Sequence, residues 1–445
     1  MVTNLTAISP VDGRYGKQTE LLSPFFSEFG LIHYRFIVEA KYLIALVGIL
    51  PELKQIKDTS IIDSLQREMA IFSLDDAQQV KTIEETTNHD VKSVEVFMRD
   101  LLHGYPKELE FIHFALTSFD TDGMARPLML KHAHEQVIVP LFMNVLHSLE
   151  VAAQQWQHVV MLARTHGQPA SPTYMGKEIM VFVERLKGQI KQFETIPWSA
   201  KLGGATGNLN AHYVAYPNID WHTFSTEFVA SLELVRTPLT TQIEPNDNLA
   251  AYCHNWVRIN NILIDFVRDI WGYIMLEYLK QKPKSGEVGS STMPHKVNPI
   301  DFENAEGNLG FANAMLEHFA SKLTISRFQR DLSDSTVVRN VGVPLAHDII
   351  SFNSILKGMK KIEINLKKIN QDLDDNWAVI SEAIQTILRR EGYPNPYDAL
   401  KELTRTGEKI TKDSLHMFID LLDVRDPVKL ELKEITPWNY TGVVL

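Results

Sequence analysis

Cysteine is almost absent from this sequence. Its 445 residues include one, Cys253, which can form neither a disulfide within the chain nor a cysteine-based metal site. We therefore expect a reducing compartment and predict a cytoplasmic location. The first residues show no basic segment followed by an apolar run, so no signal peptide is predicted. We also find no apolar stretch of the ~18 residues that a membrane span needs, and we expect no membrane association.

Positive charge is also scarce. The chain has 44 Lys and Arg against 55 Asp and Glu, a net charge of −11, whereas general nucleic-acid binding requires a basic face. A small anionic ligand in a local basic pocket remains compatible with this balance. The sequence has no GxxxxGK[ST] motif, and KLGGATGN (201–208) has its glycines without a predicted strand before it. A dinucleotide site is therefore not predicted.

Period-two alternation, the pattern of strands, is nearly absent, and the chain reads as helical almost throughout. Hydrophobic residues make up 44% and charged residues 22%, which is ordinary for a globular protein. At about 150 residues per domain the length suggests roughly three domains. We place an N-terminal helical domain at 1–113, a central long-helix bundle at 114–362 and a C-terminal helical domain at 363–445.

The clearest periodicity lies between Leu249 and Tyr273. Apolar residues there are spaced alternately by three and four, namely Leu249, Tyr252, Trp256, Ile259, Leu263, Phe266, Ile270 and Tyr273. This heptad seam predicts a helix about 36 Å long. Because other apolar residues lie off the seam, we expect the helix to be buried on several sides, in the bundle of one chain or of several subunits.

Further long helices are predicted at 25–49, 118–160, 173–195, 300–324 and 342–365. In the second of these, Pro127 suits an early turn and Pro140 predicts a kink. A short extended piece is expected at 237–245.

The breaks between helices hold the polar residues that could carry chemistry. Residues 289–299 read GSSTMPHKVNP, which has the period of neither a helix nor a strand. Its backbone N–H groups, the hydroxyls of Ser290 and Ser291 and the charge of Lys296 could together hold an anion. A capped surface turn is the alternative, and it would explain a lone Ser-Ser better than the whole string.

Other breaks leave similar alternatives open. His166 in RTHGQPA could donate a proton to a leaving atom or be a hydrogen-bonded loop histidine. In TTNHDVK, Asn88 or Asp90 could cap a helix at 91–102, which would also attract an anion. Thr117 and Ser118 could be caps, anion donors or both.

Two further patterns concern charge and metal. The stretch SRFQRDLSDSTVVRN (326–340) offers arginines and hydroxyls that suit a phosphate or a carboxylate, or else a solvated helix end with Arg–Asp pairs. His132 and His134 would point to different faces of a helix, so we predict no metal site there.

Taken together, these stretches resemble the fumarase/aspartase superfamily and, within it, the adenylosuccinate lyase family. The superfamily carries a GSSxMPxKxN loop, which Gly289 to Asn298 matches, and His295 within it is typical of adenylosuccinate lyases. The stretches SPVDGRYG, TTNHDVK, RTHGQPA and TTQIEP point the same way. The matching stretches run from residue 9 to about residue 340, and the last eighty or so residues are less diagnostic.

The resemblance implies an all-α, three-domain fumarase/aspartase-like fold with a long central helical bundle. It also implies a homotetramer whose active sites are shared between subunits. The implied reaction is β-elimination of fumarate from adenylosuccinate, giving AMP, and from SAICAR, giving AICAR, without a metal or an organic cofactor. The partners are then succinylated purine nucleotides, with no nucleic acid.

Roles follow from the resemblance residue by residue. Ser290 is the implied general base and His166 the general acid, with His89 and Lys296 as further catalytic residues. The implied substrate-binding residues are Arg14, Tyr15, Asn88, His89, Asp90, Thr117, Ser118, Gln242, Ser291, Lys296, Val297, Asn298, Asn304, Arg330, Ser335, Thr336, Val337, Val338 and Arg339.

One stretch departs from the family pattern. Adenylosuccinate lyases tend to follow the Thr-Ser pair with Glu-Asp and then asparagines, whereas this chain reads TSFDTDG, with Phe119, Asp122 and Gly123. No role is carried over to these three residues. An argininosuccinate lyase-like enzyme and a non-catalytic structural member of the superfamily remain the alternative interpretations.

Overall fold

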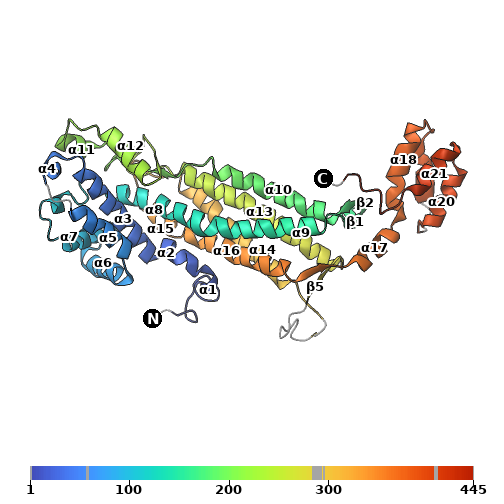
Figure 1. Ribbon diagram of the computed structural model, residues 1–445, viewed down its shortest axis with the longest axis horizontal. Helices are drawn as coiled ribbons and strands as arrows, with labels where there is room; N and C mark the ends of the chain where they lie inside the picture. The colour runs from blue at the N-terminus through green and yellow to red at the C-terminus, as the bar shows by residue number, and fades with distance from the viewer. Residues whose placement is uncertain (1–2, 57–59, 283–292, 294–295, 405–408, 444–445) are drawn as a thin grey trace. The chain divides into compact units, whose positions relative to one another are not determined.

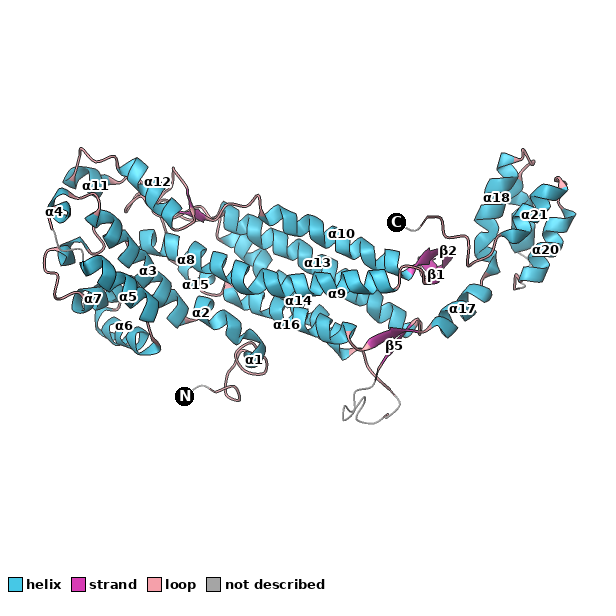
Figure 2. Ribbon diagram, in the orientation of Figure 1, coloured by secondary structure: helices cyan, strands magenta, loops and turns pink. Residues whose placement is uncertain are grey.

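The computed structural model describes residues 3–56, 60–282, 293, 296–404 and 409–443. Helices make up most of the regular structure of this part of the chain (Figures 1 and 2). The strands within it form three two-stranded sheets, β1–β2 and β5–β6 antiparallel and β3–β4 parallel.

The elements of the first half are α1 (Gly16–Thr19), η1 (Glu20–Leu22), α2 (Ser23–Phe26), α3 (Glu28–Val47), α4 (Pro51–Lys54), α5 (Ser60–Ile71), α6 (Leu74–Thr87), α7 (Asp90–Leu101), η2 (Glu108–Phe111), α8 (Ser118–Ala133), η3 (His134–Ile138), α9 (Val139–Gln155), β1 (Val160–Thr165), β2 (Gln168–Tyr174), α10 (Met175–Phe193), β3 (Ser199–Ala200) and α11 (Asn210–Ala215). Those of the second half are α12 (Trp221–Ser231), β4 (Val235–Arg236), α13 (Asp247–Met275), β5 (Leu279–Gln281), α14 (Ile300–Lys322), α15 (Ser333–Val338), α16 (Gly342–Met359), β6 (Ile362–Ile364), α17 (Leu366–Asp374), η4 (Trp377–Ile380), α18 (Ser381–Arg390), α19 (Pro396–Thr404), α20 (Lys412–Leu421) and α21 (Asp426–Glu434).

The chain divides into two compact units. The first comprises Met1–Met143, Gln189–Asn261 and Gly307–Asn353, and the second comprises Asn144–Gly188, Ile262–Glu306 and Ser354–Leu445. The long helices α9, α10, α13, α14 and α16 contribute residues to both. The division into three domains at residues 113 and 362 stays a prediction.

The N-terminal part of the first unit is built around α3. This helix contacts α5, α6, α7 and α8, and Figure 1 shows α3 beside α8. Ser27 caps its start by accepting the N–H of Gly30, and a capping box of Ser73 and Asp76 begins α6. The apolar faces of these helices enclose one core cluster that includes Ile32, Phe36, Leu43, Leu65, Val80, Val94, Phe97 and Met98.

The heptad seam forms α13, as predicted. Within the first unit the ring of Trp256 packs against Phe142 of α9 and Phe352 of α16, at centroid distances of 6.0 and 6.1 Å. Within the second unit Phe266 packs against Phe182 of α10 at 5.5 Å. The off-seam residues Val257, Ile262 and Val267 are buried as well, which confirms that the helix is buried on several faces.

The predicted helix at 118–160 differs in detail. It consists of α8, a π-helical turn at His134–Ile138 and α9, followed by strand β1. Pro127 lies inside α8 rather than in an early turn, so that expectation was wrong. Pro140 is the second residue of α9, one residue beyond the π-helical turn, and the wider spacing of that turn accommodates a residue that lacks an N–H.

The run Ser118–Gln155 contradicts the expectation that no stretch of the chain is long and apolar enough to span a membrane. It holds an 18-residue window of mean hydropathy 1.4 and so qualifies by length and composition. Core helices of soluble proteins pass the same test. This run carries the buried charged residues Asp120, Asp122 and Lys131, which are expensive in lipid and acceptable in a core that pairs them.

The strands were largely missed. The stretch RTHGQPA contains the end of β1, the turn at His166 and Gly167 and the start of β2, although no strand was predicted there. The expected extended piece at 237–245 is irregular, and the strand nearby is Val235–Arg236. A two-residue strand, Ser199–Ala200, does precede KLGGATGN. His132 and His134 form hydrogen bonds with the hydroxyls of Tyr34 and Tyr252.

A carboxyl group lies in the interior of the first unit. Asp348 on α16 is fully buried, and its Oδ1 accepts a hydrogen bond of 2.8 Å from Asn260 Nδ2 on α13. Its Oδ2 and the Oδ1 of Asn260 have no hydrogen-bond partner among the described residues. Burial raises the pKa of Asp348 well above its ordinary value, because an ionised carboxylate would lose its hydration there.

We expect Asp348→Asn to stabilise the fold at pH 8 by about 1–3 kcal/mol. A raised folded-state pKa means that stability is complete below the unfolded-state pKa and is lost as the pH rises toward the folded-state value. The amide keeps the acceptor, adds a donor and cannot ionise. Urea unfolding at pH 5 and pH 8 measures the effect, with exposed Asp63 changed to Asn as the control. An equal loss of stability at both pH values would contradict a neutral Asp348.

Candidate active site

The NHD turn joins α6 to α7. Asn88 has the left-handed φ of 49° and ends α6, while His89, rather than Asn88 or Asp90 as predicted, caps α7. The Nδ1 of His89 accepts the N–H of Lys92 at 3.1 Å. A neutral ring that accepts at Nδ1 carries its proton on Nε2, and this Nε2 lies 3.4 Å from the Oγ of Ser118. The helix start therefore turns the N–H of the imidazole toward the first residue of α8.

Thr117 caps α8, as one of the open alternatives predicted. Its N–H donates to Oδ2 of Asp120 at 2.8 Å. Asp120 is fully buried and forms an ion pair of 2.7 Å with Lys201, which is also fully buried. Oδ1 of Asp120, the oxygen that pairs with Lys201, also accepts the N–H of Gly203 at 2.8 Å. This carboxylate therefore joins the start of α8 to the loop 201–208.

The glycines of KLGGATGN allow close packing. Gly207 has a φ of +78°, and a Cβ there would come within 2.2 Å of the carbonyl oxygen of Thr240. Gln242, an expected substrate-binding residue, donates from Nε2 to the carbonyl of Ala205 at 3.1 Å. This loop therefore contacts Gln242 directly and is linked to Thr117 through Asp120, and sequence reasoning missed it as part of the site.

Asp90 connects α7 to the C-terminal end of α15. Its Oδ2 accepts from Arg35 Nη2 at 2.7 Å and from Arg339 Nη2 at 2.6 Å. Burial alone would raise the pKa of Asp90, but the two guanidinium groups hold it well below its ordinary range. Arg35 was missed, although a charge among the apolar residues of the 25–49 helix is a signal that a buried partner exists.

The stretch 326–340 contains the Arg–Asp pairs of one alternative, Arg327–Asp331 and Arg330–Asp334, while its binding of an anion stays a prediction. Arg327 is a solvated residue paired with Asp331 at 3.5 Å. Arg330 instead places its Cζ 5.1 Å from the centroid of the Phe119 ring, and α15 carries Ser335, Thr336, Val337 and Val338 up to Arg339. The N-terminal pair Arg14 and Tyr15 lies just before α1, with the guanidinium 5.8 Å from the ring.

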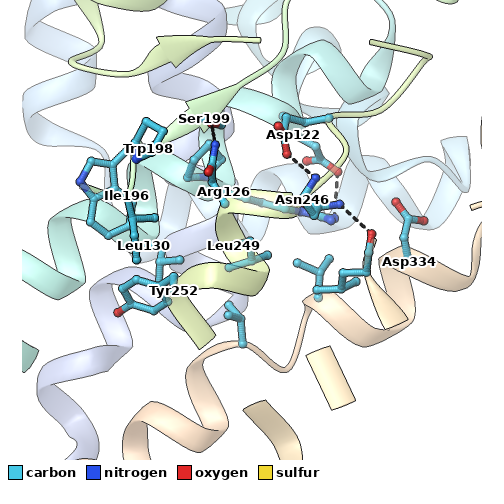
Figure 3. Close-up of a pocket in the computed structure, with 18 of the residues that line it drawn as sticks. Asp122, Arg126, Leu130, Ile196, Trp198, Ser199, Asn246, Leu249, Tyr252 and Asp334 are labelled. Atoms are coloured by element: carbon cyan, nitrogen blue, oxygen red, sulfur yellow. Dashed lines mark hydrogen bonds and ion pairs between the residues drawn. The ribbon is translucent and has the colours of Figure 1, made fainter. Parts of the chain in front are cut away.

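A cavity of about 70 Å³ lies within the first unit (Figure 3). Leu130, Ile196, Trp198 and Tyr252 gather on one side of the view, and Asp122 and Asp334 on the other. Glu244 also lines it, and burial raises the pKa of this carboxyl.

His166 occupies a two-residue hairpin turn in the second unit. His166 has a φ of 54° and Gly167 one of 75°, the pair of positive values that a type I′ turn requires. Arg164 at the base of the turn forms a 2.7 Å ion pair with Asp372, which also accepts from the hydroxyl of Tyr278 at 2.6 Å. An exposed imidazole is thus held at the tip of a fixed hairpin.

The remaining predicted residues also belong to the second unit. Lys296 is exposed and donates its backbone N–H to Met293 at 3.0 Å. The carbonyl of Val297 accepts from Gln281 at 2.9 Å, Asn298 precedes α14, and Asn304 accepts from the hydroxyl of Ser354 at 2.8 Å. Ser290 and Ser291 lie outside the described residues.

Comparison with known proteins identifies the family. The profile described as Lyase matches residues 9–314, and that described as Adenylosuccinate lyase C-terminal matches residues 326–441. An adenylosuccinate lyase of Dictyostelium discoideum is 55% identical over 456 residues, covering 100% of this chain and 98% of the relative. One of Escherichia coli K12 is 48% identical, covering 99% of this chain and 97% of the relative. The chain belongs to the adenylosuccinate lyase family.

Membership extends the resemblance to the C-terminal residues, which the motifs alone left undecided. The fold is that of the superfamily: a 3-carboxy-cis,cis-muconate lactonizing enzyme from Pseudomonas putida matches with a TM-score of 0.72 at 16% identity, over 95% of this chain and 93% of that chain. A β-carboxy-cis,cis-muconate cycloisomerase from Acinetobacter calcoaceticus matches with a TM-score of 0.70 at 18% identity, over 95% and 94%. The predicted helical lyase fold is confirmed, whereas the homotetramer and the cytoplasmic location stay predictions.

Proposed function

We propose that this chain releases fumarate from adenylosuccinate, leaving AMP, and from SAICAR, leaving AICAR, as a step of purine nucleotide biosynthesis. The observation that carries the proposal is the 55% identity, over the whole chain, to a relative named adenylosuccinate lyase. The same comparisons favour this activity over an argininosuccinate lyase. The retention of His166, Ser290, Lys296 and Asn298 together argues against a non-catalytic structural member.

The elimination reaction determines which groups the site must provide. A proton must leave a carbon next to a carboxylate, and the C–N bond on its other side must break. The carbanion places further charge on a group that is already negative, so electrostatic stabilisation contributes most to catalysis. Side chains can move both protons of this elimination, so no metal or organic cofactor is needed.

Ser290 is the proposed general base, acting as an alkoxide. A serine hydroxyl needs nearby positive charge and N–H donors before it can take a proton from a carbon. We assign these to Lys296, to Asn298 and to the backbone of the loop around Ser291, which together hold the doubly charged carboxylate. Closure of this loop over the substrate would exclude water and strengthen each of these interactions.

His166 is the proposed general acid, which protonates the departing nitrogen. Its place at the tip of an anchored hairpin supports this role, because a proton donor must be presented to the substrate without burial of the ring. His89 is the proposed positioning partner: the helix cap leaves its Nε2–H available to His166 or to a phosphate oxygen.

Substrate binding is assigned mainly to the first unit. Arg14, Tyr15, Arg330, Ser335 and Arg339 are proposed to hold the phosphate. Thr117, Ser118 and Gln242, with Asn88 to Asp90, line the rest of the substrate, joined by Thr336 to Val338, by Lys296 to Asn298 and by Asn304. We further propose a homotetramer in which each active site takes these groups from more than one subunit.

The direct test adds adenylosuccinate to the purified protein and follows the absorbance change that accompanies elimination. We expect turnover with adenylosuccinate and with SAICAR, and none with argininosuccinate in the same buffer. A flat trace with adenylosuccinate from a folded protein would favour a structural member of the superfamily, and activity with argininosuccinate would reassign the substrate.

A further inference from the structure

The first two turns of α8 contain the residues in which this chain departs from the family pattern. The sequence there is TSFDTDG, and Phe119 and Asp122 are both 5% exposed. Phe119 contacts Arg330, and Asp122 binds Arg35 and Arg126. Neither residue has a role in the proposed function.

Asp122 is the centre of a buried ion-pair cluster. Its Oδ1 accepts from Arg35 Nε at 2.7 Å, and its Oδ2 accepts from Arg35 Nη2 at 3.2 Å and from Arg126 Nη2 at 2.9 Å. Burial would raise the pKa of Asp122, but Arg126 and Arg35 lower it, so the group is a carboxylate at neutral pH.

Arg35 links Asp122 to Asp90, and Asp90 binds Arg339 of the proposed phosphate site. Arg35 is 1% exposed, and its fork joins Asp122 through Nε to Asp90 through Nη2. Asp90 in turn accepts from Arg339 at 2.6 Å. Alternating charges therefore run from Asp122 through Arg35 and Asp90 to Arg339, and each contact is 2.7 Å or shorter.

The contact with Asp90 orients the guanidinium group of Arg339. Asp90 takes one N–H of Arg339 at Nη2, and Glu28 accepts a second from Nη1 at 3.4 Å. A guanidinium has five N–H groups, so donors remain for a phosphate. Without the charge of Asp122, Arg35 would be held by Asp90 alone. Asp90 would then bind Arg35 more strongly and Arg339 more weakly, because both guanidinium groups donate to its Oδ2 and compete for it.

Phe119 acts on the second arginine. The guanidinium of Arg330 lies 5.1 Å from its ring centroid, within the range of a cation–π contact. On its other side Nε of Arg330 is 3.8 Å from Oδ1 of Asp334. A ring that attracts the cation without taking its N–H groups leaves these donors available, whereas a carboxylate at position 119 would engage them.

We propose that Phe119 and Asp122 are positioning residues that orient Arg330 and Arg339 toward the phosphate of the substrate. The proposal rests on the proposed function for the choice of ligand, a purine nucleoside monophosphate. Its physical basis is preorganisation: arginine side chains that are already ordered lose less conformational entropy when the phosphate binds.

The test measures binding rather than turnover. Calorimetry of the purified protein with AMP and with adenosine isolates the phosphate contribution, since the two ligands differ only in that group. Asp122→Asn and Phe119→Leu are each expected to weaken AMP binding roughly tenfold, the size of one lost charge-assisted hydrogen bond, and to change adenosine binding less than about twofold. If the Asp122→Asn variant does not fold, Phe119→Leu still tests the proposal.

A matched control is available on α3. Glu39 is also buried, where it accepts from His113 at 2.6 Å and from Thr121 at 2.5 Å. Glu39→Gln removes a buried negative charge without touching the chain to Arg339, so the ratio of AMP to adenosine affinity should stay at its wild-type value. A purely structural role for Asp122 would predict the same fall in both ligands.

Double-mutant cycles test whether Asp122 acts through Arg339 and Phe119 through Arg330. The effect of Asp122→Asn should vanish when Arg339 is already alanine, and that of Phe119→Leu when Arg330 is alanine. Independent, additive losses, or a wild-type protein that does not prefer AMP to adenosine, would overturn the proposal. If the variants lose AMP affinity as expected but the wild-type protein does not cleave adenylosuccinate, the proposed function is wrong and the positioning is supported.

Discussion

Replacing Ser290 with alanine is expected to lower kcat by at least about 10³-fold while substrate still binds. The proton on the succinyl carbon has no other assigned acceptor, and removing a catalytic base or nucleophile costs this much or more in enzymes that depend on one. Binding should persist because the phosphate and the carboxylates are held by other residues. Stopped-time assays of fumarate release and calorimetry with adenylosuccinate measure the two properties separately.

Ser291→Ala is the matched control, since it removes a hydroxyl from the next position of the same loop. This residue is assigned to substrate binding, so its loss should raise KM several-fold and leave most of kcat. The Ser290 assignment would be wrong if the two variants behaved alike, or if Ser290→Ala kept a near-normal rate.

The sequence predicted the long helices well because their signal is local and repetitive. The seam of α13 repeats every three or four residues between Leu249 and Tyr273, and it forms the helix Asp247–Met275. Such a pattern fixes which face is buried without knowledge of any partner. Several loops of the candidate site were also proposed from their polar, turn-forming residues, whereas the loop 201–208 was not assigned to it.

Contacts between distant segments were not predictable in this way. Arg35 and Asp122 are separated by 87 positions, and the buried pair of Asp120 and Lys201 also joins distant segments. The sequence shows each charge but not its partner, because pairing depends on the packing of several helices. Local chemistry also misled the prediction at the start of α7, where an imidazole nitrogen rather than a carboxylate or an amide accepts the helix N–H.

The hairpin at His166 was missed for a different reason. Its two strands are short, and Pro169 and Pro172 interrupt the second, so neither alternation nor β-propensity stood out. The one available signal was the dipeptide His-Gly, because a two-residue turn with positive φ at both positions favours glycine and tolerates few other residues.

Because of this turn geometry, His166→Asn is a better test of the proposed general acid than His166→Ala. Asparagine adopts the left-handed φ of 54° that residue 166 requires more readily than alanine does, and Asn-Gly is the preferred pair for such a turn. The variant should therefore fold normally and lose only the imidazole. We expect kcat to fall by about 10²- to 10⁴-fold, the usual contribution of a general acid, whereas the exposed His158 changed to Asn should retain its rate.

Mixing the two dead variants tests where the groups of one site come from. If His166 and Ser290 of a site belong to different subunits, random exchange of His166→Asn and Ser290→Ala subunits leaves roughly a quarter of the sites with both groups intact. Activity should then reappear after mixing, in proportion to exchange measured with a labelled subunit. Complete exchange without any recovered rate would place both groups in one subunit, because only then does every site keep one of the two replacements.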